Sequence, residues 1–277
     1  MISRVIIEKV GAEDDLEAPA PPSISEILTN VWLDTKIRAP FLPFKPSIKV
    51  RYERGKILNA IFPTTRIEVT SEDTLVAGHR LYKAGLNPCI LNFADDKEAG
   101  GIVENGNAAQ EESLWRRTNL CVTQVQAFYP LRMAPATVQE GVYTPLATVF
   151  KDTEENECAN LREPWPSAFI AVPGLKFPRI NRDGHVCLED LMAMRAKIAL
   201  IFQTAKEHGH ESLVLGPLGC GVWRSPPRHV AEIFRGACLE YKGVFKHIVF
   251  ACLVKGRGAA STTNYTIFKD VFSTLTI

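Results

Sequence analysis

A short apolar run that leads directly into a polar, glycine-bearing loop and then into a helix restricts this chain to an α/β fold. Residues 89–93 form the apolar run, the loop reads ADDKEAGGIVENGNAA, and the helix is expected to begin at Gln110. Upstream, residues 64–69 alternate polar and apolar side chains as a strand does, and residues 71–85 carry a helical apolar pattern. A strand, a helix and a strand in this spacing form a βαβ unit, whose two strands pair in parallel.

The rest of the chain continues this alternation of strand and helix patterns. Strands are expected at residues 143–150, 167–172, 212–215 and 246–254, and helices at residues 188–205, 230–241 and 264–275. Two polar stretches, residues 151–166 and 173–186, are expected to be irregular surface segments. These patterns predict a mixed, mainly parallel sheet that is covered by helices on both faces.

The first 60 residues differ in composition from the remainder. We expect residues 1–60 to be an N-terminal extension packed on a core domain of residues 61–277. Within the extension, residues 11–23 are acidic and then proline-rich, which is typical of a flexible connector. Ser25 is expected to cap a short helix, and the basic, proline-rich residues 35–50 are expected to lie over the surface.

Charge and cysteine content limit the partners and the compartment. The formal net charge of +1 gives no reason to expect a nucleic-acid partner. Seven cysteines without a C-x-x-C pair favour reduced thiols, and therefore an intracellular protein, cytoplasmic or nuclear. No apolar run is long enough for a membrane span, so no membrane partner is expected. The six histidines show no zinc-binding spacing, so no metal site is expected either.

The glycine loop and the glutamates that follow it form the first candidate site. Glycines allow backbone N–H groups to approach anionic oxygens closely. Glu111 and Glu112 directly follow this loop, which suggests acid/base chemistry on a phosphate-bearing substrate. A plain interpretation competes with this one, because such loops are often simple turns and acidic residues suit any helix N-terminus.

A second strand leads into a second glycine loop. Residues 213–223 read LVLGPLGCGVW, and a helix is expected to follow at Val230. In open α/β sheets, ligands bind beyond the carboxyl ends of the strands. Both loops leave their strands at that end, so we expect them to hold the two sides of a diphosphate.

Together, NFADDKEAGGIVENGNAAQEE and LVLGPLGCGVWRSPP resemble the microbial-type (bacterial and fungal) poly(ADP-ribose) glycohydrolases. The resemblance extends over residues 64–272 and includes the segment DTLVAGHRLYKAG. It implies a macrodomain-like, three-layer α/β/α fold and hydrolysis of the ribose–ribose O-glycosidic bonds of poly(ADP-ribose). Poly(ADP-ribose) or ADP-ribosylated proteins would be the partners and ADP-ribose the product, as in the reversal of ADP-ribosylation during the DNA damage response. The resemblance implies no cofactor, and we expect a monomer.

The resemblance also implies roles for individual residues. Glu112 would be the catalytic acid/base, which protonates the leaving ribose oxygen and then deprotonates the attacking water. Glu111 would position the distal ribose through a hydrogen bond. The remaining ligand-binding residues implied in this way lie on the two loops or beside them: Asn92, Gly100, Gly101, Asn107, Gln110, Gly219, Cys220, Gly221, Val222 and Trp223.

Two departures from the family pattern leave other functions open. Ala99 replaces the first of three usual glycines, and Asp95 would repel a diphosphate unless it faces solvent or a sugar hydroxyl. A macrodomain that binds ADP-ribose without hydrolysing it therefore remains an alternative, as does a mono-ADP-ribosyl-protein hydrolase. The adenine-stacking residue is not identified by the sequence, since Phe250 is expected to be a core residue.

Overall fold

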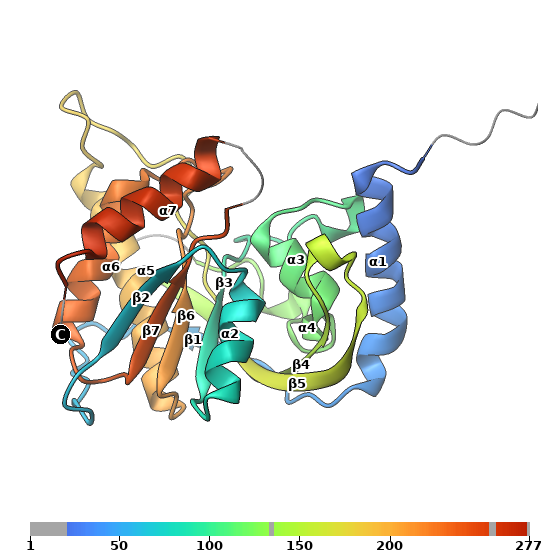
Figure 1. Cartoon of the computed structure of the whole chain (residues 1–277). Coiled ribbons are helices and arrows are strands. Elements are labelled where there is room, and N and C mark those ends of the chain that lie inside the picture. The colour runs from blue at the N-terminus through green and yellow to red at the C-terminus, as the bar shows by residue number, and fades with distance from the viewer. Residues whose placement is uncertain (1–20, 133–135, 255–258, 276–277) are drawn as a thin grey trace, which may run out of the picture.

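The computed structural model describes residues 21–132, 136–254 and 259–275, and these residues form an α/β domain around one sheet (Figure 1). The sheet has seven strands in the order β1-β4-β5-β3-β6-β7-β2. The five strands from β5 to β2 pair in parallel, whereas β1-β4 and β4-β5 are antiparallel pairs. The prediction of a mixed, mainly parallel sheet is confirmed.

The predicted elements are found near their expected positions. The strands are β1 (Ile48–Arg51), β2 (Arg66–Thr70), β3 (Pro88–Asn92), β4 (Glu140–Lys151), β5 (Asn160–Ala171), β6 (Ser212–Leu215) and β7 (His247–Ala251). The helices are α1 (Ile24–Arg38), α2 (Thr74–Lys83), α3 (Gln110–Arg117), α4 (Leu120–Thr123), α5 (Leu188–Glu207), α6 (Pro227–Glu240) and α7 (Ala259–Phe272). In the described part of the chain, none of these helices combines the length and the apolar character that crossing a membrane requires.

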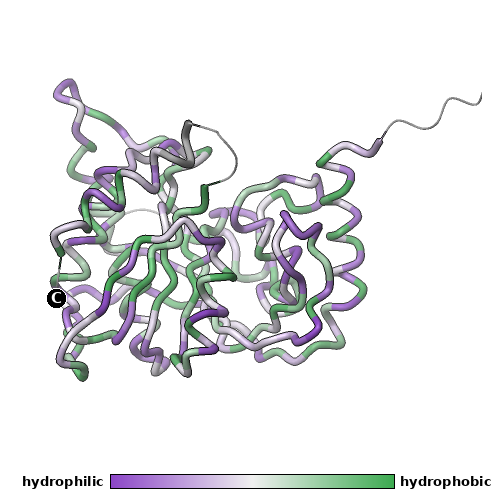
Figure 2. Tube along the Cα trace, viewed as in Figure 1, coloured by the Kyte–Doolittle hydropathy of each residue, from purple (hydrophilic) through white to green (hydrophobic). Residues whose placement is uncertain are grey.

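Helices cover both faces of the sheet, which gives the predicted three layers. Successive side chains of a strand point to opposite faces, so Leu91 of β3 packs in a core with α5, α6 and α7. Its neighbour Ile90 packs on the other face, in a core with α2 and α3. Apolar residues are concentrated on the strands and on the inner sides of the helices (Figure 2). The sheet is therefore buried on both faces, as the continuous apolar runs of β3, β6 and β7 require.

The N-terminal extension is continuous with this core from residue 21 onward. Its strand β1 pairs with β4 at the edge of the sheet, and its helix α1 packs against α3. The α1 N-cap is Ser23 rather than the predicted Ser25, because Ser23 and Glu26 form a reciprocal capping box. The helix continues to Arg38, and most of residues 35–50 are exposed, which confirms that this segment lies over the surface. The boundary near residue 60 stays a prediction, and residues 1–20 lie outside the described residues.

One other local prediction is wrong. The polar stretch of residues 151–166, expected to be irregular, supplies most of β5, a long strand whose first half is largely exposed and whose second half is buried. Its sequence is polar because only the second half of the strand lies in the core. The N-cap of α2 is Asp73, whose carboxylate accepts hydrogen bonds from the backbone N–H groups of Leu75 and Val76.

Helix α5 carries a lysine in the interior. Lys197 is fully buried, and its ammonium has no hydrogen-bond partner among the residues that the structure describes. Burial lowers the pKa of Lys197 to about 7, although the negative charge of Asp96 opposes this shift. Desolvation disfavours the charged amine, so the folded protein holds this proton less tightly than the unfolded chain does.

We therefore expect Lys197→Met to stabilise the protein at pH 7 by about 1–3 kcal/mol, because it removes a buried donor without a partner. In the wild type, the unfolding free energy should rise with pH between about 7 and 10.5, since only the unfolded chain binds the proton in this window. Chemical denaturation across this pH range would measure both effects. Lys206→Met, at a less buried position of the same helix, is the control and should keep the wild-type slope.

Candidate active site

Four parallel strands deliver their loops to one edge of the sheet. Neighbouring strands β5, β3, β6 and β7 run in the same direction, so their carboxyl ends meet there. The first loop, residues 93–109, follows β3, and the second loop, residues 216–226, follows β6. Because β3 and β6 are adjacent, the two glycine loops that the sequence separates by more than a hundred residues lie next to each other. This confirms the predicted placement of the loops at one edge of the sheet.

Gln110 anchors the start of α3 to the end of β3. Its side-chain oxygen accepts a hydrogen bond from the backbone N–H of Phe93 at 2.9 Å, and its amide donates to the carbonyl of Leu91 at 2.8 Å. Gln110 therefore replaces strand partners that β3 loses where its ladder ends. This fixes the first turn of α3, which carries Glu111 and Glu112, over the carboxyl end of the sheet.

Glu111 is held on both carboxylate oxygens. Oε1 accepts a hydrogen bond from Nδ2 of Asn92 at 3.2 Å, and Oε2 accepts one from the backbone N–H of Asp95 at 2.6 Å. The side chain is buried. Burial raises the pKa of Glu111 well above its ordinary value, and the charges of Glu112 and Asp95 add to the rise, whereas the two hydrogen bonds oppose it. The position of Glu111 is thus fixed by two hydrogen bonds, while burial and neighbouring negative charges disfavour its ionised form.

Glu112 is held on one oxygen. Oε1 accepts hydrogen bonds from the backbone N–H of Ile102 at 3.2 Å and from Nδ2 of Asn107 at 3.0 Å. Within the described residues, Oε2 has no hydrogen-bond partner. Gly101 lies against the carboxylate, since a Cβ at this position would lie 2.6 Å from Oε1 of Glu112. The arrangement fixes the carboxylate while leaving one oxygen to exchange a proton.

Glycines of the first loop are needed for close packing as well as for backbone conformation. Gly100 has a φ of +82°, and a Cβ there would lie 2.4 Å from the ring of Trp115. Trp115 is buried, and its ring lies 6.0 Å from that of Trp32 in α1. The first loop is therefore packed between α3 and α1, and the N-terminal extension supports the site.

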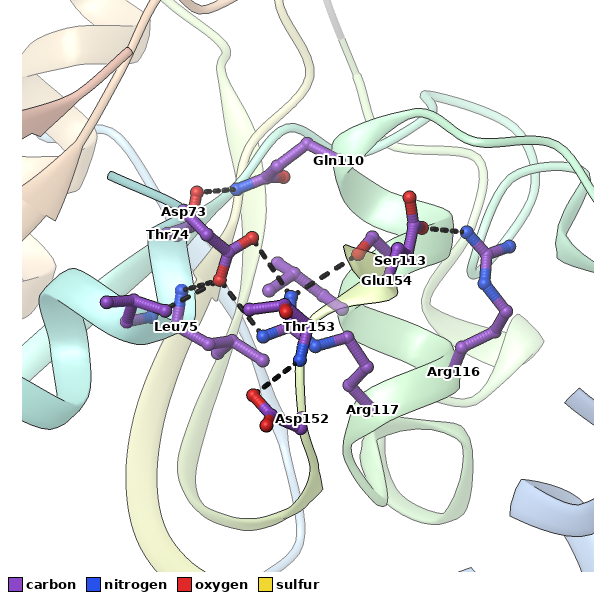
Figure 3. Close-up of polar contacts among 12 residues, drawn as sticks. Asp73, Thr74, Leu75, Gln110, Ser113, Arg116, Arg117, Asp152, Thr153 and Glu154 are labelled. Atoms are coloured by element: carbon purple, nitrogen blue, oxygen red, sulfur yellow. Dashed lines mark hydrogen bonds and ion pairs between the residues drawn. The ribbon is translucent and has the colours of Figure 1, made fainter. Parts of the chain in front are cut away.

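Arg116 and Arg117, which follow the two glutamates in α3, are both buried. Arg117 forms an ion pair with Asp73 at 2.9 Å and contacts Ser113, which joins α3 to the N-terminus of α2 (Figure 3). Arg116 pairs with Glu154 at 2.6 Å and donates to the carbonyl of Asn107 at 2.6 Å. Within the described part of the chain, neither guanidinium forms a hydrogen bond or an ion pair with Glu111 or Glu112. Both arginines hold α3 and the first loop in place.

A cavity of about 390 Å³ opens beside the glutamates. The second loop lines it through Gly219, Gly221, Val222 and Trp223, and the first turn of α3 lines it through Gln110. Glu111 and Glu112 are not part of the lining and lie directly next to it. A larger cavity of about 710 Å³ lies elsewhere, between α5, α6 and residues 52–56, away from all the predicted site residues. We assign the site to the smaller cavity because five of the twelve predicted site residues line it, whereas none lines the larger cavity.

The second loop has a tight backbone. Gly219 has a φ of +76°, and a Cβ on the neighbouring Gly174 would lie 2.8 Å from the Cα of Gly219. Cys220 is not among the cavity-lining residues, and burial raises the pKa of its thiol far above the ordinary value. Cys220 is therefore a poor nucleophile, in line with the prediction that small size explains its presence.

The negative charge of Asp95, which would otherwise repel a diphosphate, is balanced by hydrogen-bond donors and by a lysine. Its carboxylate accepts hydrogen bonds from the backbone N–H groups of Lys97 and Glu98 and pairs with Lys176 at 3.1 Å. Burial raises the pKa of Asp95, but these partners outweigh burial and hold the pKa below its ordinary value. Lys176 lies in a segment that the sequence predicted only as an irregular surface stretch.

Sequence reasoning also missed several residues that line the cavity. Phe93, Gly174 and Leu253 come from loops after three different strands. Gly174, two residues beyond an apolar run, was the one available signal, because a glycine there indicates close backbone approach. Phe250 is fully buried and packs on Phe234, Phe268 and Phe272, which confirms its prediction as a core residue. Across the described residues, no group of three or more His, Cys, Asp or Glu side chains could hold a metal ion.

Comparisons with known proteins point to one family. Residues 34–152 match the family model described as microbial-type PARG, catalytic domain, where PARG denotes poly(ADP-ribose) glycohydrolase. The structure resembles the PARG of Thermomonospora curvata with a TM-score of 0.72 and 29% identity, covering 88% of this chain and 99% of that one. The same bacterial enzyme bound to the inhibitor ADP-HPD gives a TM-score of 0.70 at 28% identity, covering 88% and 98%. The PARG of Deinococcus radiodurans in complex with ADP-ribose gives 0.63 at 26% identity, covering 90% and 92%. No curated protein sequence matches the chain significantly.

We expect Gly101→Ala to displace the Glu112 carboxylate and to destabilise the protein by about 1–3 kcal/mol, because φ is +60° at this position and the new Cβ would meet Oε1. Thermal denaturation and a crystal structure of the variant would test this. Gly184→Ala is the matched control, since Gly184 has a φ of +81° and no atom within 4 Å of its Cβ position. Equal losses of stability in both variants, with Glu112 unmoved, would show that the contact with Gly101 does not hold the carboxylate.

Proposed function

The chain carries the catalytic domain of the microbial-type poly(ADP-ribose) glycohydrolases, and on this premise we propose that it hydrolyses ribose–ribose O-glycosidic bonds in poly(ADP-ribose) and releases ADP-ribose. The observation that carries the proposal is the unequal anchoring of the two buried glutamates. Glu111 accepts hydrogen bonds on both oxygens, whereas Glu112 is fixed through one oxygen and keeps the other available. One carboxylate is thus equipped to position a ligand and the other to transfer a proton.

In the proposed reaction, Glu112 is the general acid/base. As the glycosidic bond breaks through an oxocarbenium-like state, protonated Glu112 gives its proton to the leaving ribose oxygen. The resulting carboxylate then takes a proton from the attacking water, which adds to the anomeric carbon. Hydrogen bonds from Ile102 and Asn107 keep Oε1 in place, so the geometry of Oε2 is preserved through both proton transfers.

Glu111 is proposed to position the distal ribose. A carboxylate has about four acceptor positions, and the hydrogen bonds from Asn92 and Asp95 use two of them, so the others can accept from a ribose hydroxyl. Asn92 supports this role indirectly, because its amide holds Glu111 and it is fully buried at the end of β3. Gly100, Gly101 and Asn107 likewise shape the loop around the glutamates.

The second loop is proposed to hold the diphosphate. Residues 219, 221 and 222 would supply backbone N–H groups from the tight turn, whereas the N–H of Cys220 already donates to the carbonyl of Pro217 at 3.1 Å. Trp223 would pack on the distal ribose. Lys176, which lies near both loops, adds positive charge on this side. These contacts favour a diphosphate-bearing substrate with no cofactor.

The partners proposed are poly(ADP-ribose) and ADP-ribosylated proteins, with the chain acting as a monomer and without direct contact to nucleic acid. We also propose an intracellular location, cytoplasmic or nuclear. All seven cysteines are free in the structure, which suits a reducing compartment.

Glu112→Ala should lower the rate of ADP-ribose release from purified poly(ADP-ribose) by about 10²–10⁴-fold, which is the usual contribution of general acid/base assistance. The measurement is chromatographic detection of free ADP-ribose with wild type and variant at equal concentration. Binding of ADP-ribose by calorimetry should survive, because the substitution leaves the second loop intact.

Glu155→Ala serves as the control and should keep the wild-type rate. Glu155 is exposed, and its side chain forms no hydrogen bond or ion pair with the described residues. If wild type releases nothing yet binds ADP-ribose, the chain is a non-hydrolysing ADP-ribose reader. If it acts only on mono-ADP-ribosylated protein, the proposed substrate is wrong and the alternative hydrolase activity is correct.

A further inference from the structure

Lys176 contacts both loops of the site. It follows β5 and Gly174, and its side chain is 33% exposed. The ammonium pairs with Asp95 at 3.1 Å and also with Asp96, both in the first loop. It also lies 4.6 Å from the centre of the Trp223 ring in the second loop, within cation–π distance. One side chain from the segment after β5 therefore contacts the segments that follow β3 and β6.

The contact with Asp95 connects Lys176 to Glu111, because Asp95 itself forms a hydrogen bond with that glutamate. The Asp95 carboxylate organises the turn into the glycine loop by accepting the N–H groups of Lys97 and Glu98. The backbone N–H of Asp95 donates to Glu111 at 2.6 Å. A displacement of Asp95 would thus move one of the two donors that hold Glu111.

The contact with Trp223 leads to the second loop, where the backbone is strained. The backbone N–H of Phe177 donates to the carbonyl of Trp223 at 2.8 Å, so the segment of Lys176 is tied to the second loop twice. Phe177 has a φ of +49° and Arg224 one of +56°, a conformation that residues other than glycine rarely adopt. Strained residues on both sides of the junction persist only where surrounding contacts hold them, and Lys176 supplies such contacts.

We propose that Lys176 is a positioning residue that fixes the glutamate-bearing first loop against the second loop and so sets the geometry of the reaction. This inference rests on the proposed function for its kinetic consequences. The set of contacts that Lys176 makes with Asp95, Asp96 and Trp223, which we call the clamp, is a property of the two loops alone. Lys176 also offsets the negative charge of Asp95 and Asp96 beside the site that would take a diphosphate.

A competing role for Lys176 is direct attraction of the substrate diphosphate. The two roles predict opposite effects of Asp95→Asn. If Lys176 is a clamp, removing its partner loosens the first loop and lowers turnover. If Lys176 is a phosphate ligand, removing the competing carboxylate frees the ammonium and tightens ADP-ribose binding.

The kinetic test compares Lys176→Met, Lys176→Arg, Asp95→Asn and the Lys176→Met/Asp95→Asn double variant on purified poly(ADP-ribose). We expect Lys176→Met to lower kcat by about tenfold or more, because small misplacements of catalytic groups carry large rate penalties. Lys176→Arg should restore most of the rate, Asp95→Asn should lose in the same direction, and the double variant should lose less than the two single effects multiplied. Arg182→Met should keep the wild-type kcat. It removes an exposed positive charge from the same segment, and Arg182 forms no ion pair or side-chain hydrogen bond with the described residues. Tighter ADP-ribose binding by Asp95→Asn, or a Lys176→Met loss confined to KM, would overturn the clamp.

A second measurement does not depend on activity. Hydrogen–deuterium exchange of residues 94–101 and 219–224 should be faster in Lys176→Met than in wild type, and unchanged in Arg182→Met. If wild type releases no ADP-ribose, the proposed function fails while the exchange data still decide on the clamp. Unchanged exchange in both loops would refute it.

Discussion

Each of the two glutamates in this protein is held by one backbone N–H and one asparagine amide. Asn92 and the N–H of Asp95 serve Glu111, and Asn107 and the N–H of Ile102 serve Glu112. A buried pair of neighbouring carboxylates is costly, because burial and mutual repulsion both disfavour charge. These four donors offset that cost. Three of them, from Asp95, Ile102 and Asn107, lie on the first loop, and Asn92 directly precedes it at the end of β3. The rest of the structure can therefore be understood as the means of fixing the path of that loop.

Several elements contribute to fixing the first loop. Gln110 ties its far end to β3, and Arg116 ties Asn107 to α3. From the other side, α1 packs Trp32 on Trp115, and Gly100 allows the loop to lie directly on that indole. The N-terminal extension is thus part of the wall behind the site. The hydrolase chemistry needs this rigidity, because proton transfer tolerates little displacement of the carboxylate.

The second loop is built by different means. It has no buried charged network of its own, and it relies on the close approach of Gly174 to Gly219 and on contacts with the segment after β5. Lys176 connects this loop to the first one. The site therefore combines a firmly buried half, which carries the two glutamates, with a more exposed half that is proposed to hold the diphosphate.

The sequence by itself determined the order of strands and helices, the parallel sheet, the two glycine loops at its carboxyl edge and the position of the glutamate pair. These features follow from local patterns, since side-chain periodicity and glycine spacing act within a few residues. The tertiary structure decided what depends on distant partners. Arg117 is buried because Asp73, 44 residues away, meets it, and Asp95 is tolerated because Lys176, 81 residues away, pairs with it. The unequal anchoring of the two glutamates was likewise decided in three dimensions, because only the folded first loop leaves one oxygen of Glu112 without a partner among the described residues. Ion pairs and packing between remote segments carry no local pattern, so only the folded chain shows them.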